Sequence, residues 1–237
     1  MPKSKAPGVK FGYYSDGCAL FWKTSTFELV SEERLAFKLG NQVIIVARLR
    51  HISSGVVMVV AVTHLKAQKS ETNEKIRRMQ AEEVLGFVQN AVRQQAVKQG
   101  SDDIPVLIMG DLNADPPSEI PFADSSVKRI LSNHCLPGGD EEAKPLKFCS
   151  AYPVDPPQAS FFTTWKTRGT DTVKRIIDYI FYSDNLKCTE WLEVPTEEEL
   201  EGAQSPNHAP LPGLRYPSDH LMVAAKFDFF GSATPQR

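Results

Sequence analysis

The chain has 237 residues, of which 41% are hydrophobic and 24% are charged, and its formal net charge is −2. This length and composition predict one large α/β or β-rich domain with a sizeable core, and they exclude a chain that is disordered by composition. The near-neutral charge argues against non-specific coating of nucleic acid but leaves a local basic groove open.

The first half of the sequence predicts several strands and one long helix. Runs rich in Val, Ile and aromatic residues are expected to form strands at 18–22, 26–30, 41–49 and 56–65. The last two are joined by a hairpin loop in which Gly55 takes a positive φ. Residues 70–100 predict a helix, with Ser70 as its N-cap and Gly100 beyond its end. Its buried stripe is expected to consist of Ile76, Met79, Val84, Val88, Ala91 and Val92.

The second half alternates strands with short helices and loops. Strands are expected at 104–110, 160–165, 175–183 and 221–230. Short helices are expected at 125–133 and 196–202. Thr196 and Glu199 fit a capping box at the start of the second of these helices. Residues 137–158 predict a long surface loop, and 205–220 predict an extended, proline-rich approach to the last strand.

One domain is expected over residues 16–231, with an irregular leader at 1–15 and a flexible tail at 232–237. The four cysteines are widely spaced and form no C-x-x-C pair, which predicts reduced thiols and argues against a zinc site.

The longest apolar runs are too short to cross a bilayer, and the opening residues lack the apolar core of a secretory signal. We therefore expect a cytoplasmic monomer with no membrane partner.

The stretch PVLIMGDLNADP, residues 105–116, ends an apolar strand on two polar side chains, Asp111 and Asn113. Residues i and i+2 of a strand point to the same face, so the pair shares a face if the strand continues through Asn113. Asp offers a base or a metal ligand, and Asn offers an N–H donor to an anionic oxygen. A turn capped by the Asp side chain is the simpler alternative for this stretch alone.

Three further strand ends carry polar residues. His64 and Lys66 end the strand that precedes the long helix. Asp178 lies within the apolar run RIIDYIFYS, and Asp219 and His220 stand just before the last strand. Taken singly, each has an ordinary structural explanation, such as a core histidine, a turn-anchoring carboxylate or a solvated lysine. Several such ends in one chain favour a site, because catalytic groups gather at strand ends and their loops.

The residue types at these strand ends favour one class of chemistry. The sequence has no G-x-S-x-G elbow and no P-loop, which argues against acyl transfer and nucleoside-triphosphate motor chemistry. The carboxylates suit a hard cation, Mg²⁺ or alternatively Mn²⁺. Water attack on a phosphate ester then needs a base, for which Asp111 is suited, and donors to the phosphoryl oxygens, for which Asn113 and His220 are suited. Asp178 can hold His220 in the required tautomer.

Five motifs occur in the order found in the exonuclease–endonuclease–phosphatase superfamily of Mg²⁺-dependent phosphoesterases. In chain order they are THLKA, GDLNADP, TTWK, IDYIFYS and YPSDH. The chain resembles this superfamily from about Asp16 to Phe229. DGCALFW, THLKA and the spacing from TTWK to DYIFYS are most similar to its nocturnin-like branch, a relative of the CCR4-type deadenylases. The resemblance implies an α/β (α+β) fold, a two-layer β-sandwich flanked by helices of the DNase I type. The active site would lie at one end of the facing sheets.

The resemblance also implies a role for each polar strand end. Asp111 would orient or deprotonate the attacking water next to the metal, and Asn113 would bind the phosphate. His220 would stabilise the transferring phosphoryl group, with Asp178 as its partner. The other residues with implied roles are Asp219 at the metal, His64 at the phosphate, and Lys66 and Gln68 at the substrate.

An adenosine-containing phosphate is the substrate that the resemblance implies. Proteins of this branch are linked to 3′–5′ removal of poly(A) and to the 2′-phosphate of NADP(H), and the sequence leaves both open. The branch has an Arg two residues after the motif lysine, where this chain has Gln68. The change weakens a charged contact to a substrate phosphate, and Lys69 is the neighbour that can compensate.

The family places a metal-binding Glu upstream of DGCALF, in a Gln-Glu pair that ends an early strand, and residues 1–15 contain no Glu or Asp. The resemblance therefore implies that the first strands and the principal metal ligand are missing and that this form is impaired. Two alternatives stay open. One is a catalytically silent RNA- or nucleotide-binding module, which the basic residues within 66–98 support. The other is a DNA-repair endonuclease of the same superfamily.

Overall fold

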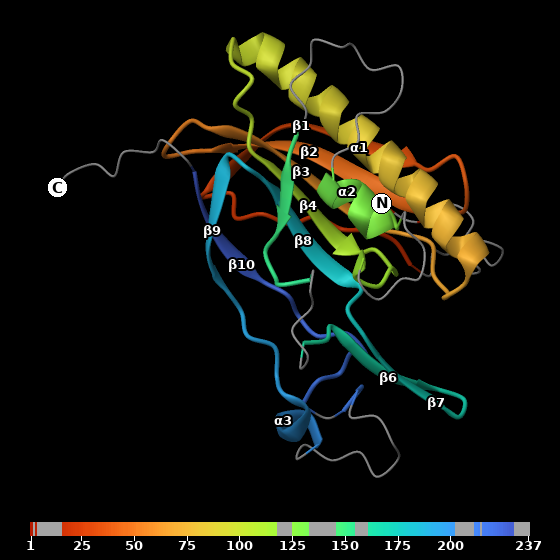
Figure 1. The fold of residues 1–237 in the computed structure, drawn as a ribbon. Coiled ribbons are helices and arrows are strands. Elements are labelled where there is room, and N and C mark those ends of the chain that lie inside the picture. The colour runs from red at the N-terminus through yellow and green to blue at the C-terminus, as the bar shows by residue number, and fades with distance from the viewer. Residues whose placement is uncertain are drawn as a thin grey trace.

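The computed structural model describes most of the chain, and Figure 1 shows its fold. The structure describes residues 1, 3, 16–117, 125–132, 146–154, 161–201, 211–213 and 215–229. The strands are β1 (Phe27–Ala36), β2 (Val43–His51), β3 (Val57–His64), β4 (Val106–Asp111), β5 (Phe148–Ser150), β6 (Thr164–Arg168), β7 (Asp171–Arg175), β8 (Asp178–Ser183), β9 (Leu186–Trp191) and β10 (Ala225–Phe229). The helices are α1 (Glu71–Gln99), α2 (Ser126–Ser132) and α3 (Glu197–Glu201).

Six strands form the central sheet, in the order β1-β2-β3-β4-β8-β5. β3 and β4 are parallel, whereas the other neighbouring pairs of this sheet are antiparallel. α1 makes the crossover between β3 and β4 and lies along one face of the sheet, with α2 beside it (Figure 1). Because the two parallel strands run in the same direction, both end at the same edge, where His64 pairs with Asp111 in register.

The long helix α1 begins and ends where the sequence predicts. The Ser70 hydroxyl accepts a hydrogen bond from the backbone N–H of Asn73, 3.1 Å away, and Gly100 closes the helix with a φ of 67°. From Ala81 onward the helix packs on the sheet through apolar side chains. These are Ala81, Val84, Leu85, Val88, Ala91 and Val92.

Before Ala81, α1 buries polar side chains instead of apolar ones. The expected stripe is wrong at Met79, which is 45% exposed, and at Ile76, which is only half-buried. In their place the helix buries Glu74, Arg77 and Gln80. A pattern of apolar spacing cannot find such a face, because charged and amide side chains normally mark the side of a helix that faces water.

The face of the sheet away from α1 carries a second, smaller layer. β9 and β10 form a two-stranded antiparallel sheet, and Phe229 of β10 packs on this face with Leu49 and Met58. The ring of Phe227 lies 5.2 Å from that of Tyr182 in β8, measured between centroids. An apolar hollow of about 850 Å³ remains beside β10. The two-layer sandwich with helices on its outside, as implied by the resemblance, is thereby confirmed.

The hairpin of β6 and β7 and the short helix α3 stand off the lower end of the sheet in Figure 1. A separate apolar cluster holds this part together, and its members are Phe162, Trp165, Leu200, Leu211 and Leu221. The Lys174 ammonium lies over the Trp165 ring, 4.0 Å from its centroid, and pairs with Glu197 of α3. Thr164 of β6 forms a β-bridge with His220, which fixes the approach to β10.

Several predicted elements are shifted. Residues 18–22 form no strand, and the run RIIDYIFYS is divided between the end of β7 and β8. β5 lies inside the stretch 137–158 that predicts a loop, and β9 has no counterpart among the predicted strands. Both are short strands that depend on their partners, β8 and β10, more than on their own periodicity. Most of the predicted leader, all of the tail and all of 202–210 lie outside the described residues, so the domain limits stay predictions.

Three cysteines, Cys18, Cys149 and Cys188, are free thiols, as expected, and Cys135 lies outside the described residues. In the described part of the chain no helix is both long enough and apolar enough to span a membrane. α1 has 29 residues, but its outer face is charged.

Candidate active site

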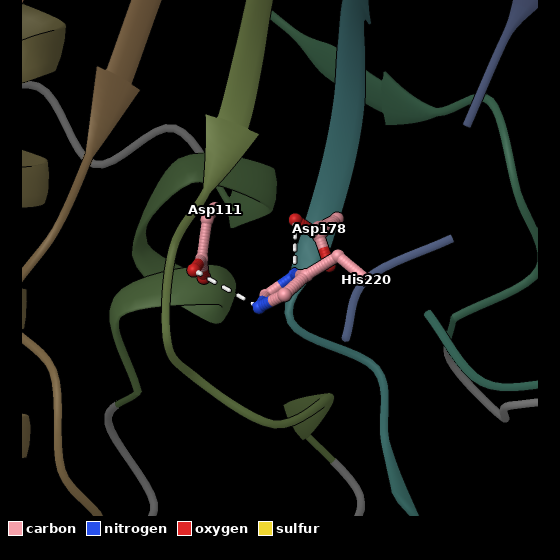
Figure 2. Close-up of side chains that lie close together, drawn as sticks. All are labelled: Asp111, Asp178 and His220. Carbon is pink, nitrogen blue, oxygen red and sulfur yellow. Dashed lines mark hydrogen bonds and ion pairs between the residues drawn. The ribbon is translucent and has the colours of Figure 1, made fainter. Parts of the chain in front are cut away.

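Four of the predicted residues meet at one edge of the central sheet. His64 ends β3, Asp111 ends β4 and Asp178 begins β8, so three adjacent strands carry them. His220 comes from the approach to β10 and is brought in by its bridge to Thr164. Figure 2 shows Asp111, Asp178 and His220 with their side chains turned toward one another.

The imidazole of His220 lies between the two carboxylates. Its Nδ1 is 2.9 Å from Oδ2 of Asp178, and its Nε2 is 4.0 Å from Oδ2 of Asp111 (Figure 2). On the other side of Asp111, Nε2 of His64 is 3.6 Å from the same oxygen. A carboxylate next to Nδ1 keeps the proton on that nitrogen in the neutral ring, so Asp178 sets which nitrogen of His220 faces Asp111.

The two threonines of the TTWK motif hold this geometry, a role that sequence reasoning missed. The Thr163 hydroxyl accepts hydrogen bonds from two successive backbone N–H groups, the second being that of Asp178 at 3.1 Å. Thr164 donates its hydroxyl to the backbone oxygen of Asp219, 2.7 Å away, and bridges His220. One motif therefore orients both members of the Asp178–His220 pair.

Asn113 lies beside Asp111, but not on a shared strand face. β4 ends at Asp111, and Asn113 has a φ of 51°. The backbone N–H of Asn113 donates to Oδ1 of Asp111 at 2.8 Å, which is the capped turn that was the simpler alternative. Its Nδ2 donates to the carbonyl of Leu65 at 3.2 Å. Asn113 therefore braces the chain after β3, and its contact with a phosphate stays a prediction.

Asp219 lies at the margin of the site and pairs with a lysine. Its Oδ2 is 3.3 Å from Nζ of Lys166, which is also 3.3 Å from Nε2 of His220. Among the described residues, the group with ligand atoms within 4.8 Å of one another consists of Asp111, Asp178 and His220, without Asp219. The predicted role of Asp219 at a metal stays a prediction. Lys166 is a cation of the TTWK motif whose place beside His220 and Asp219 sequence reasoning missed.

Lys3 is a further cation at the site that sequence reasoning missed. Its Nζ is 3.4 Å from Nδ1 of His64 and 2.7 Å from Oδ2 of Asp16. The backbone N–H of Lys3 donates to the carbonyl of Asp16, and that of Cys18 donates to the carbonyl of Met1. These bonds carry the lysine to the site, and one lysine in a basic stretch carries no sequence signal that could have identified it.

The loop after β3 (residues 65–69) borders the site and carries the predicted substrate residues Lys66 and Gln68. Lys66 is half-buried, and Gln68 is exposed with a φ of 75°. Lys69 pairs with Oδ2 of Asp115 at 2.9 Å, and the other oxygen of this buried carboxylate accepts from Nε of Arg175 at 2.6 Å.

Burial and neighbouring charges shift the titration of the central residues. Burial, and secondly the charge of Asp178, raises the pKa of Asp111 to about 6. Burial, and secondly the charge of Lys3, lowers the pKa of His64 to about 4. The hydrogen bond to Asp178 raises the pKa of His220. At neutral pH, Asp111 is therefore ionised and His64 is neutral, while His220 is the group best able to take up a proton.

The pair of carboxylates fits a divalent cation. Hard cations such as Mg²⁺ and Mn²⁺ prefer oxygen ligands, which Asp111 and Asp178 supply within one small cluster. Nδ1 of His220 is occupied by Asp178, so the carboxylate oxygens are the better ligands. The charge of Asp178 contributes to the raised pKa of Asp111, and a cation beside them would relieve this repulsion.

A sequence profile of the Endonuclease/Exonuclease/phosphatase family matches residues 6–220. The chain belongs to this family. Nocturnin of Xenopus laevis is 34% identical over 235 residues, which cover 96% of this chain and 53% of the relative. The Ccr4 exoribonuclease subunit of the CCR4-Not complex of Candida glabrata is 25% identical over 254 residues, covering 93% of this chain and 27% of the relative.

Among solved structures of the family is the human Nocturnin catalytic domain with bound sulfate. It superposes on this chain with a TM-score of 0.66 and is 28% identical in sequence. The superposition covers 97% of this chain and 70% of the Nocturnin chain. The resemblance to the nocturnin-like branch, with the Ccr4 exoribonucleases as more distant relatives, is confirmed. The chain spans about half the length of the curated Nocturnin proteins that it matches.

Proposed function

We propose that this chain is a metal-dependent phosphoesterase of the Nocturnin type, which hydrolyses a phosphate ester of an adenosine-containing substrate by direct attack of water. The observation that carries the proposal is the convergence of His64, Asp111, Asp178 and His220 at one sheet edge, from four separate segments. Membership of the family supports a phosphoesterase, and the residues supply the groups that such a reaction requires.

Asp111 is the residue that orients the attacking water and accepts its proton. In the metal-free protein its pKa of about 6 leaves it ionised at neutral pH, so its carboxylate is able to accept a proton. Its Oδ1 is occupied by the N–H of Asn113, whereas its Oδ2 faces the two histidines. The proton of the water would pass to Oδ2.

His220 and two lysines stabilise the negative charge on the phosphoryl oxygens. With Nδ1 bound to Asp178, a protonated His220 offers its Nε2–H on the side of Asp111, where charge develops during attack. Lys166 adds a positive charge next to that nitrogen, and Lys3 adds another next to His64. A divalent cation held by Asp111 and Asp178, Mg²⁺ or alternatively Mn²⁺, would supply Lewis-acid stabilisation of the phosphoryl charge.

The relatives support a phosphate ester as substrate. The human Nocturnin domain binds sulfate, a tetrahedral anion like phosphate, and the Candida glabrata relative is named as a 3′–5′ exoribonuclease. The adenosine part of the proposal rests on the resemblance to the nocturnin-like branch, which leaves two candidates, the 2′-phosphate of NADP(H) and the 3′ end of poly(A). In the structure, Gln68 replaces the branch's arginine, and neighbouring Lys69 is engaged by Asp115.

The test is a product assay with the full chain and its Asp111→Asn variant in the presence of Mg²⁺ or Mn²⁺. One arm supplies NADP⁺ or NADPH and measures released phosphate, and the other supplies a poly(A) oligonucleotide and measures released AMP. We expect metal-dependent product in at least one arm and none from the variant. A folded, metal-supplied chain that forms no product from any of these substrates would contradict the proposal.

Two further measurements on the same protein, oligonucleotide binding and nicking of abasic duplex DNA, decide the alternatives. A silent binding module would retain the oligonucleotide without releasing AMP, and a DNA-repair endonuclease would instead nick duplex DNA that contains an abasic site. The basic residues of α1 give the binding module limited support. Lys75 pairs with Glu71 at 2.8 Å and Arg77 pairs with Glu74 at 2.7 Å, so part of this charge is neutralised within the helix.

A further inference from the structure

The first half of α1 meets the site through a buried arginine. Arg77 is 2% exposed, and its Nη1 donates to the backbone carbonyls of Lys66, 2.8 Å away, and Gln68, 2.9 Å away. Its Nε donates to Oε2 of Glu74 at 2.7 Å, and Oε1 of Glu74 accepts from the N–H of Ser126 in α2 at 2.8 Å. A buried guanidinium is costly unless partners satisfy it, and here two of those partners are the backbone of the loop after β3.

Gln80, almost one turn further along the helix, holds the same loop. It is fully buried, and its Oε1 accepts the backbone N–H of Lys66 at 2.9 Å. Its Nε2 donates to Oε1 of Gln42 at 3.0 Å. Residues three apart in a helix lie on one face, so Arg77 and Gln80 both reach the backbone of Lys66. Arg77 binds its carbonyl, and Gln80 binds its N–H.

The loop after β3 has a backbone shape that needs such support. Gln68 has a φ of 75°, in the left-handed region that residues other than glycine rarely adopt. Its carbonyl is one of the two that Arg77 binds. On the opposite side, the pair between Lys69 and Asp115 ties the loop to the segment after β4. The loop is thus held from the helix and from the strand segment.

We propose that Arg77 is a positioning residue for substrate binding: it fixes the backbone of the loop after β3 so that Lys66 presents its charge to an anionic substrate. This inference rests on the phosphoesterase function proposed above. Attachment of the helix alone does not require an arginine, since α1 from Ala81 onward packs through apolar side chains such as Val84 and Val88. A buried ionic network adds little net stability over such apolar packing. The position of the Arg77–Glu74 network under the loop after β3 therefore indicates that its role is to orient the backbone of that loop.

Arg48 offers a matched control. It is 5% exposed, and its guanidinium also bonds to α1, at the carbonyl of Ala91 (3.1 Å) and at Oε1 of Gln94 (2.6 Å). These contacts lie in the half of the helix away from the site. Replacing Arg48 by Met therefore removes a buried arginine and its bonds to α1 without touching the loop after β3.

Steady-state kinetics of Arg77→Met and Arg48→Met, with whichever adenosine phosphate the full chain turns over, separate positioning from stability. We expect Arg77→Met to raise KM about tenfold with kcat within about twofold, because substrate contacts are displaced but the reacting groups are not. Arg48→Met should lower stability while leaving KM unchanged. Equal effects of the two variants on KM would overturn the proposal.

A double-mutant cycle tests the route of the effect. In a Lys66→Met background, the loop has lost the charge that it presents, so Arg77→Met should change KM by less than about twofold. An undiminished effect of Arg77→Met in that background would mean that Arg77 acts through something other than Lys66, and the proposal would fail.

Amide hydrogen exchange provides a readout that needs no activity. The N–H of Lys66 is bonded to Gln80, and we expect its exchange to be faster by about tenfold in Arg77→Met and unchanged in Arg48→Met. Unchanged exchange in Arg77→Met would overturn the positioning role. Absence of turnover in the full chain would instead contradict the proposed function, so the two failures are distinguishable. If Arg77→Met does not fold, Gln80→Leu, which removes the acceptor for the Lys66 N–H, takes its place.

Discussion

Both carboxylate oxygens of Asp178 face Nδ1 of His220, at 2.9 Å and 3.2 Å, although the two residues are 42 positions apart in the chain. Thr163 fixes the backbone of Asp178, and Thr164 bridges His220, so neighbouring residues of β6 and its approach set both ends of this contact. The carboxylate therefore controls the orientation of the ring and its affinity for a proton together.

Replacing Asp178 by Asn should lower the pKa of His220, because the hydrogen bond to this carboxylate is the main cause of its rise. The pKa of Asp111 should also fall below about 6, since the charge of Asp178 contributes to raising it. NMR titration of the metal-free protein measures both. Asp171→Asn, at an exposed position of β7, is the control that should leave them unchanged. An unaltered His220 in Asp178→Asn would contradict the assigned contact.

Replacing Asp111 by Asn should abolish turnover and also stabilise the metal-free protein at pH 7. The folded state raises this pKa from 3.8 to about 6, so the parent loses stability as the pH rises from about 4 to about 6 and keeps that loss at higher pH. The predicted gain of the variant is about 3 kcal/mol at pH 7, and it should disappear below about pH 4, where both states of the parent hold the proton. Urea unfolding of both proteins at each pH measures the difference. A variant less stable than the parent at pH 7 would rule out this account.

Mg²⁺ should raise the melting temperature of the chain, because a cation that binds only the folded state stabilises it by mass action. The rise should be lost in Asp111→Asn, which removes a ligand. It should persist in Asp219→Asn, since that carboxylate pairs with Lys166 and lies outside the cluster of Asp111, Asp178 and His220. Loss of the rise in Asp219→Asn would instead support the role at the metal that the sequence resemblance implies.

Replacing Gly110 by Ala should destabilise the fold by about 3 kcal/mol or more. Gly110 has a φ of 145°, and a Cβ there would lie 1.9 Å from the carbonyl oxygen of Thr63 on the neighbouring strand. Gly55→Ala is the control, with a positive φ of 72° but no atom within 4 Å of the added Cβ, and it should cost only about 1 kcal/mol. Equal losses of unfolding free energy in the two variants would show that the close approach of β3 and β4 adds no cost to a side chain at position 110.

The sequence predicts the site better than the elements around it. His64, Asp111 and Asp178 could be identified because each is a polar residue at the end of an apolar run, a pattern that costs stability unless the residue has a task. Lys3 could not, because only its contacts with Asp16 and His64 bring it to the site.

The missed strands and contacts share a physical cause. β9 lacks a strong periodic pattern and is defined by its pairing with β10. The buried face formed by Glu74, Arg77 and Gln80 reads in sequence as a water-facing surface, because its partners are backbone atoms of a distant loop. The sequence leaves two conformations open for Asn113, a continued strand and a turn capped by Asp111, and the hydrogen bond from the Asn113 N–H to Asp111 shows that the turn forms.

The parallel pairing of β3 with β4 also bears on how the protein folds. α1 must be traversed before the two strands can meet, and the bond from Asn113 to Leu65 closes a separation of 48 residues. Such contacts require loop closure of high entropic cost, so they form later than local helical structure. Helical circular dichroism should therefore recover before Mg²⁺ affinity during refolding, and the functional centre would be among the last parts of the molecule to mature.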